Sequence, residues 1–211
     1  MRTLLFDTDV LLLISGLDCF DTTLDLLEVE RPQVYTLAAV PHIVKSPKLQ
    51  RHYGEQTIAR VQQILPDLQT LASVSAADQR ILRVLALVEE IDPGEALLIA
   101  KTINMPDAIL LSGDKRWMRS LCKSRVKAVV LIKKQLHGTV VSFEHVLQAL
   151  LARVGFAELA TAVAKSKLPH LTLRVLFPQD VKEPENDCRE GLLAYLGKLE
   201  ATAGREFFYR F

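Results

Sequence analysis

Short apolar runs alternate with longer amphipathic segments over residues 1–140, and this alternation constrains the fold more than any other feature. The runs of strand length are Thr3–Phe6, Val34–Val40, Ala108–Leu111 and Ala128–Ile132. Strands that are separated by helices pair in parallel through crossover connections, which place helices on both faces of the sheet. The sequence therefore predicts an α/β fold with three layers and a central parallel sheet.

Two helix starts are marked by side chains that can cap a helix. Ser75 to Asp78 and Asp92 to Glu95 both have capping-box spacing, and Pro93 adds a proline at the first helical position. Residues 46–54 read as a polar loop, which precedes a helix from about Glu55 to Leu65.

Beyond residue 140 the pattern becomes mainly helical. We therefore expect two parts, an α/β domain over residues 1–140 and a helical C-terminal extension over residues 141–211. Ser142 is the expected cap of the first helix in the extension, and Gly191–Leu199 is its last helical segment. A linker is expected near Pro178–Asn186, where the sequence is polar and contains proline.

Several classes of protein are disfavoured by what the sequence lacks. No apolar run approaches the roughly 18 residues of a membrane-spanning helix, so we expect no membrane partner. Cys19, Cys122 and Cys188 lie too far apart for a zinc ribbon or a disulfide framework. These features indicate a cytoplasmic protein.

The net charge of +1 hides a strong segregation of charge along the chain. Residues 3–30 contain seven acids and no Lys or Arg, whereas residues 115–134 contain eight bases and no acid. An uninterrupted basic stretch can bind the phosphate backbone of a nucleic acid, although each base alone is equally consistent with a solvated surface. The candidate nucleic-acid-binding residues are Lys115, Arg116, Arg119, Lys123, Arg125 and Lys127.

Acids stand where two of the expected strands end. Asp7 and Asp9 follow the first strand, Asp114 follows the strand at Ala108–Leu111, and Glu95 lies in the first turn of the helix that leads into that strand. The carboxyl ends of parallel strands share one edge of the sheet, so these acids can converge.

Converging carboxylates need a counter-charge. Two of them about 4 Å apart repel by roughly 4 kcal/mol at an effective dielectric near 20. Mg²⁺ or Mn²⁺ is the natural occupant of an all-carboxylate site, and either ion can activate water and stabilise charge on a phosphoryl oxygen. The candidate metal ligands are Asp7, Asp9, Glu95 and Asp114, and the candidate catalytic residues are Asp7, Glu95 and Asp114.

Each acid also has a structural explanation. Glu95 can complete a capping box with Asp92, and Asp114 can cap the helix that begins at Lys115. Asp7 is harder to explain structurally, because an acid at the end of a buried strand is rarely left without a partner.

The motifs L-L-F-D-T-D-V-L-L, D-P-G-E-A-L-L-I-A and I-L-L-S-G-D-K-R, in this order, resemble the PIN domain. That family consists of three-layer α/β, metal-dependent ribonucleases and includes the toxins of bacterial toxin-antitoxin pairs. The resemblance covers residues 1–140 and implies an endoribonuclease with Asp7, Glu95 and Asp114 as its acids. It implies RNA as a partner and leaves open a protein inhibitor or partner and a homo-oligomer.

Two alternatives remain. The family tends to place a Glu on an early helix, where this chain has Lys45, and only Glu55 could substitute. The chain can therefore be a catalytically degenerate PIN-like scaffold that binds RNA or a protein. Asp7-Thr8-Asp9 also resembles the nucleophile and acid of haloacid-dehalogenase-type phosphatases, but Leu11 departs from that motif.

Overall fold

A computed structural model describes residues 2–178 and 183–211, and at its centre lies a five-stranded parallel sheet. The strands lie in the order β3-β2-β1-β4-β5, and every neighbouring pair is parallel. Their bounds are β1 Thr3–Phe6, β2 Val34–Thr36, β3 Gln69–Thr70, β4 Ala108–Ser112 and β5 Val140–Ser142.

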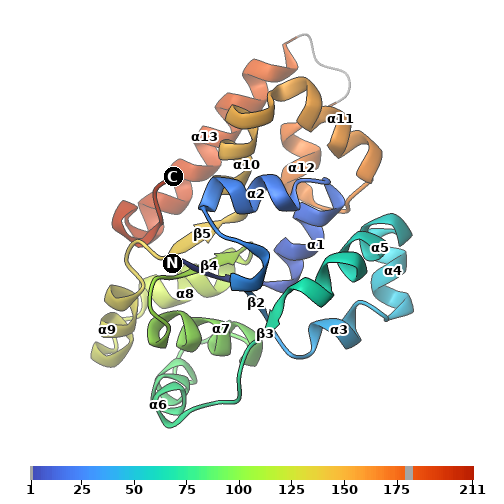
Figure 1. The fold of residues 1–211 in the computed structure, drawn as a ribbon. Coiled ribbons are helices and arrows are strands. Elements are labelled where there is room, and N and C mark those ends of the chain that lie inside the picture. The colour runs from blue at the N-terminus through green and yellow to red at the C-terminus, as the bar shows by residue number, and fades with distance from the viewer. Residues whose placement is uncertain (1, 179–182) are drawn as a thin grey trace.

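Helices make up most of the remaining structure (Figure 1). Those that connect the strands are α1 Thr8–Gly16, α2 Phe20–Leu27, α3 Val40–Ile43, α4 Pro47–Tyr53, α5 Glu55–Ile64, α6 Ala76–Leu85, α7 Pro93–Asn104, α8 Lys115–Lys123 and α9 Lys127–Gln135. Those that follow the sheet are α10 Phe143–Val154, α11 Phe156–Ser166, α12 Leu171–Leu176 and α13 Pro184–Ala203. Short 3-10 helices cover Arg31–Gln33, Leu65–Asp67 and Arg205–Phe207.

Successive side chains of each strand face opposite layers, as the period of a strand requires. Leu4 and Phe6 of β1 pack with α1, α2, α5 and α10, whereas Leu5 packs with α7, α8 and α9. Figure 1 shows α6, α7 and α9 on one side of the sheet and α10 to α12 on the other. The predicted three-layer α/β fold with a central parallel sheet and a mainly helical C-terminal extension is therefore confirmed.

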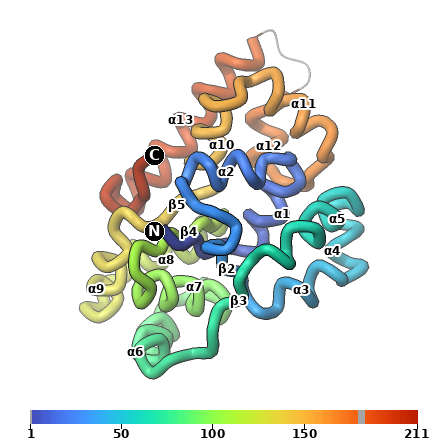
Figure 2. The backbone as a smooth tube through the Cα atoms, in the orientation of Figure 1, coloured from blue at the N-terminus to red at the C-terminus, as the bar shows by residue number. Residues whose placement is uncertain are grey.

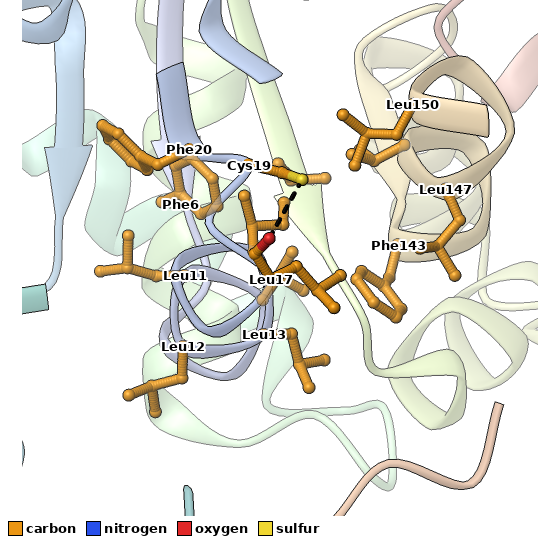
Figure 3. Packing of buried hydrophobic residues seen from close by; sticks show 14 of the residues in the cluster. Phe6, Leu11, Leu12, Leu13, Leu17, Cys19, Phe20, Phe143, Leu147 and Leu150 are labelled. Atoms are coloured by element: carbon orange, nitrogen blue, oxygen red, sulfur yellow. Dashed lines mark hydrogen bonds between the residues drawn. The ribbon is translucent and has the colours of Figure 1, made fainter. Parts of the chain in front are cut away.

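The layer that contains Leu4 and Phe6 of β1 is built around aromatic and leucine side chains (Figure 3). The rings of Phe6 and Phe20 stack with their centroids 5.8 Å apart. Leu147 and Leu150 of α10 belong to the same buried cluster, so the helical extension shares a hydrophobic core with β1. Burial of this kind contributes about 25 cal/mol per Å² of apolar surface removed from water.

The C-terminal extension packs against both layers. Its longest helix, α13, contacts α8, α10 and α12. Beyond α13, Phe208 forms a parallel bridge with Val140, and the amide of Tyr209 donates to the carbonyl of Val140 over 2.8 Å. The end of the chain thus covers the outer edge of β5, which removes an exposed strand edge.

Two predicted elements are wrong. Residues 128–132, predicted as a strand, lie in helix α9, where Val129 and Ile132 face inward three residues apart. A short apolar run cannot be assigned to a strand or a helix by periodicity alone, and the true edge strand is β5. Residues 46–54, predicted as a loop, contain helix α4, which starts with Pro47 at its first position.

Other boundaries differ from the prediction more modestly. The strand expected over residues 34–40 ends at Thr36, and Val40 already begins α3. The last helix begins at Pro184 rather than Gly191, so that part of the expected linker is helical. Residues 179–182 of the expected linker lie outside the described residues.

None of the helices in the described ranges is both long and apolar enough to cross a membrane.

Candidate active site

The strand order reverses between β1 and β4, and this point organises the candidate site. The chain proceeds from β1 to β2 and β3 on one side, and then returns to β4 and β5 on the other side of β1. In an open parallel sheet, ligands bind at the carboxyl ends of the strands at such a reversal. Asp7 directly follows β1, and Asp114 lies two residues beyond β4.

Asp7 stands at the N-cap position of α1, but its side chain makes no capping bond. Instead, the hydroxyl of Ser112 donates to Asp7 Oδ2 over 2.8 Å. The indole Nε1 of the buried Trp117 in turn donates to Ser112 Oγ over 3.1 Å. This chain of hydrogen bonds fixes the carboxylate at the end of β1 from the neighbouring strand.

Glu95 and Asp114 both form the caps that their structural explanations predict. Glu95 Oε2 accepts from the amide of Asp92, and Asp92 Oδ1 accepts from the amide of Glu95, each over 2.8 Å. Asp114 Oδ1 accepts from the amide of Arg116 over 2.6 Å and caps α8. The capping roles also hold both carboxylates at the carboxyl edge of the sheet.

The acids act on one another electrostatically. Burial raises the pKa of Asp7 to about 6, and the charges of Asp9, Asp114 and Asp92 add to this effect against the hydrogen bond from Ser112. Burial likewise raises the pKa of Glu95 to about 7, with further contributions from Asp92, Asp114 and Asp7. Burial is therefore the main reason why both carboxyl groups hold a proton close to neutral pH, and the neighbouring acids add a smaller electrostatic contribution.

Asp114 behaves differently, because it has a cation beside it. Burial acts to raise the pKa of Asp114, but hydrogen bonds and the charge of Arg116 outweigh burial and hold this pKa below its ordinary value. A side-chain hydrogen bond with Glu95 lowers it further. Two carboxyl groups can share such a bond only when one of them is protonated. Glu95 has the higher pKa of the two, so Glu95 is the group that carries the proton.

The oxygens of Asp114 are engaged by Arg116, which contacts Oδ2 through its terminal nitrogen and donates from Nε over 2.9 Å. In the parts of the chain that the structure describes, no three His, Cys, Asp or Glu side chains stand in a group that could hold a metal ion. The structure therefore brings three predicted acids into electrostatic range, with Asp114 neutralised by a guanidinium of its own helix.

Asp9 lies at the rim of this cluster and is exposed. The hydroxyl of Tyr53, the last residue of α4, donates to Asp9 Oδ1 over 3.3 Å. Burial, together with the charges of Asp9 and Asp7, raises the pKa of Tyr53 above its ordinary value. Tyr53 is therefore a site residue that the sequence does not indicate, because the sequence predicts a loop over residues 46–54.

Lys45 and Glu55 lie at the surface. Lys45 is exposed just after α3, and Glu55 is exposed in the first turn of α5. The charges that act most strongly on Asp7 are those of other acids, and neither Lys45 nor Glu55 is among them.

The six candidate nucleic-acid-binding residues after β4 divide into two groups. Those that are exposed are Arg116, Arg119, Lys123, Arg125 and Lys127. Lys115 is different, because its side chain is only 21% exposed and pairs with Glu144, whose side chain is fully buried. The Lys115 ammonium also lies 5.4 Å from the centre of the Tyr195 ring in α13. Lys115 therefore ties α8 to the helical extension.

Glu144, Ser112 and Trp117 were not among the site residues predicted from the sequence. Ser112 is the last residue of β4, a position that always lies at the carboxyl edge, so its place was available as a signal. Glu144 gives no such signal, because it lies in the first turn of α10, after the strand β5, and the sequence predicts the edge strand at residues 128–132 instead of at β5.

Comparison with known proteins gives no relative. The chain matches no protein-family model, no curated protein and no solved structure. The resemblance to PIN domains stays a prediction from the sequence motifs.

Proposed function

We propose that this protein is a divalent-metal-dependent endoribonuclease of the PIN type, which hydrolyses RNA phosphodiesters at the Asp7, Glu95 and Asp114 cluster. The observation that carries the proposal is the position of the acids: Asp7 and Asp114 follow β1 and β4 at the reversal of strand order. The raised pKa values of Asp7, about 6, and of Glu95, about 7, agree with it, because a divalent cation would offset the burial and the repulsion that favour the protonated form of each carboxyl group. The proposed partner is RNA, and the proposed compartment is the cytoplasm, where the free thiols of Cys19, Cys122 and Cys188 would stay reduced.

The donor set supports Mg²⁺ or Mn²⁺ as the cofactor. Asp7, Asp9, Glu95 and Asp114 offer only carboxylate oxygens, the ligands that these ions prefer. To take part, Asp114 would exchange Arg116 for the ion, and Glu95 would lose its shared proton. When bound, the ion would supply Lewis-acid activation of water and stabilise charge on the phosphoryl oxygens.

The residues of the chain have separate tasks in this proposal. Ser112 holds the carboxylate of Asp7 in one orientation through its 2.8 Å hydrogen bond. Arg116, once released from Asp114, is free to contact the phosphate on which the reaction occurs, because its side chain is 71% exposed. The exposed bases from Arg119 to Lys127 position the RNA backbone.

Cleavage of a single-stranded RNA labelled at both ends tests the proposal. The wild-type protein should cleave it in Mg²⁺ or Mn²⁺ and not in EDTA, and Asp7→Asn should abolish cleavage while the protein stays folded. Asp25→Asn is the matched control, because Asp25 is exposed on α2, away from the strand ends. Cleavage by Asp7→Asn at the wild-type rate would refute the assignment.

One observation favours a second candidate, a PIN-like scaffold without activity. Arg116 already neutralises Asp114, as a metal would in an active enzyme. The two candidates differ in their response to Arg116→Gln. In the nuclease this change should increase the affinity for Mn²⁺, because it removes the competitor for Asp114, whereas Arg119→Gln on the same helix should not. A scaffold would show no Mn²⁺ binding in either variant.

A further inference from the structure

A second basic segment lies on the other side of the acids from α8. Residues 31–54 contain no Asp or Glu, and three of their bases, Lys45, Lys48 and Arg51, are exposed. None of these three forms an ion pair with an acid of residues 2–178 or 183–211. Their charges are therefore available to an external anion.

The sheet topology sets where this segment lies. β2 and β4 flank β1 on opposite sides. α3 and α4 follow β2, and α8 follows β4, so the two basic segments leave the carboxyl edge on opposite sides of Asp7. Figure 2 shows α3 and α4 on one side of the molecule and α8 and α9 on the other.

Helix α4 is attached to the candidate site at its last residue. Tyr53 packs against the core cluster and donates to Asp9 Oδ1 over 3.3 Å. The ring of His52 meets the Tyr53 ring edge to face, with centroids 4.9 Å apart. The second basic segment thus ends beside the acids, rather than on a distant surface.

The helix presents its bases to solvent. No residue of α4 is fully buried, and only Leu49 and Tyr53 pack against the core. Lys48 and Arg51 are three residues apart and so share one face of the helix. Lys45 lies just before this helix, whose cap residue is Ser46. A seven-residue helix with so little buried surface has no large packing role of its own.

We propose that Lys45, Lys48 and Arg51 bind the phosphate backbone of a single-stranded RNA on the β2 side of the acids. One strand then lies across the carboxylates, with phosphates held by α4 on one side and by α8 on the other. Phosphate contacts of this kind position a nucleic acid without reading its sequence. The exposed His52 beside Tyr53 offers an aromatic surface for a base next to the reacting phosphate.

This inference rests on the proposed function and gives Lys45 a different role. A lysine in the metal cluster would oppose a cation, whereas an exposed lysine just before α4 attracts the substrate. Lys45 is then part of the RNA path rather than a sign of lost activity.

The test measures the salt dependence of RNA binding in EDTA, so that cleavage does not interfere. The probe is a fluorescein-labelled single-stranded 20-mer RNA, followed by anisotropy with the full-length chain. The α4 variant carries Lys45→Gln, Lys48→Gln and Arg51→Gln. The α8 variant carries Arg119→Gln, Lys123→Gln and Arg125→Gln. The control carries Arg80→Gln, Arg83→Gln and Lys198→Gln, which remove the same charge from exposed positions on α6 and α13.

The α4 variant should bind the RNA at least tenfold more weakly than the control at about 0.1 M salt. The magnitude of its slope of log K against log salt should fall by about 2, because three phosphate contacts are lost and each contact with a single strand contributes about 0.7. The α8 variant should show a similar loss of affinity and a similar fall in slope. If the α4 variant binds like the control while the α8 variant is weakened, the inference is wrong and the proposed function stands. If only the α4 variant is weakened, the inference holds and the RNA contacts proposed for α8 are wrong. If both variants bind like the control, the inference is wrong and so are the RNA contacts proposed for α8, while the Asp7→Asn cleavage assay still decides the proposed metal-dependent cleavage.

Discussion

The strongest energetic prediction concerns the carboxyl group of Asp7, whose pKa rises from 3.8 to about 6 on folding. This shift of about 2 pKa units corresponds to about 3 kcal/mol, at about 1.4 kcal/mol per unit. Between these two values the folded protein holds the proton more tightly than the unfolded chain does. Stability is therefore lost as the pH rises from 3.8 through 6, and the full loss is present above pH 6.

Asp7→Asn should remove this loss. The amide has nearly the same size, stays neutral at every pH, and its oxygen can still accept from Ser112. We expect the variant to be more stable than the wild type by up to about 3 kcal/mol at pH 8, and by little at pH 4, where both side chains are neutral. A gain in stability from removing a charge, together with a loss of activity, is typical of a functional site.

Urea denaturation at pH 4, 6 and 8 in EDTA measures this difference. EDTA matters, because a divalent ion that binds only the folded wild type would stabilise it and mask the effect. Asp25→Asn is again the control, and its free energy of unfolding should equal that of the wild type at each pH. The reasoning is refuted if Asp7→Asn is no more stable than the wild type at pH 8, or if its gain is the same at pH 4.

Two other side chains give independent tests. Ser112→Ala removes the hydrogen bond that lowers the pKa of Asp7, so this pKa should rise above about 6 in a carbon-detected NMR titration, and an unchanged value would show that the bond has no electrostatic role. Lys115→Met leaves the buried Glu144 carboxylate without its cation and should cost about 3 kcal/mol in urea denaturation. Adding Glu144→Gln should restore most of that stability, and a double variant as unstable as the single would contradict the pairing.

The sequence predicts correctly those helix starts and strands that depend on residues close together along the chain. The capping boxes at Ser75 and Asp92 form as expected, because a cap depends on residues only three positions apart. β1 and β4 were recognised because a buried strand of a parallel sheet is apolar throughout. The same rules placed Asp7 and Asp114 at strand ends and Glu95 in the first turn of α7.

The errors arose where tertiary packing decides between two local possibilities. The Ala128–Ile132 run is equally compatible with a strand and a half-buried helix, and contacts with α6 and α8 accompany the helical outcome. Helix α4 has only two residues, Leu49 and Tyr53, that pack against the core, which is too few for hydrophobic periodicity to reveal a helix.

The partners of the site residues were not predictable either, because they come from distant segments. Ser112 lies 105 residues from Asp7, and Tyr53 lies 44 residues from Asp9. Sequence spacing indicated that the acids could meet, but not that Arg116 would turn back onto Asp114.

The central claim is that the acids at this edge gather closely enough to require a divalent cation. A crystal soaked in Mn²⁺ tests it most directly, through the anomalous difference density of the ion. We predict a single peak among the carboxylates of Asp7, Glu95 and Asp114, with the Arg116 guanidinium displaced from Asp114. A map without a peak there at saturating Mn²⁺, and with Arg116 still bound to Asp114, would contradict the account.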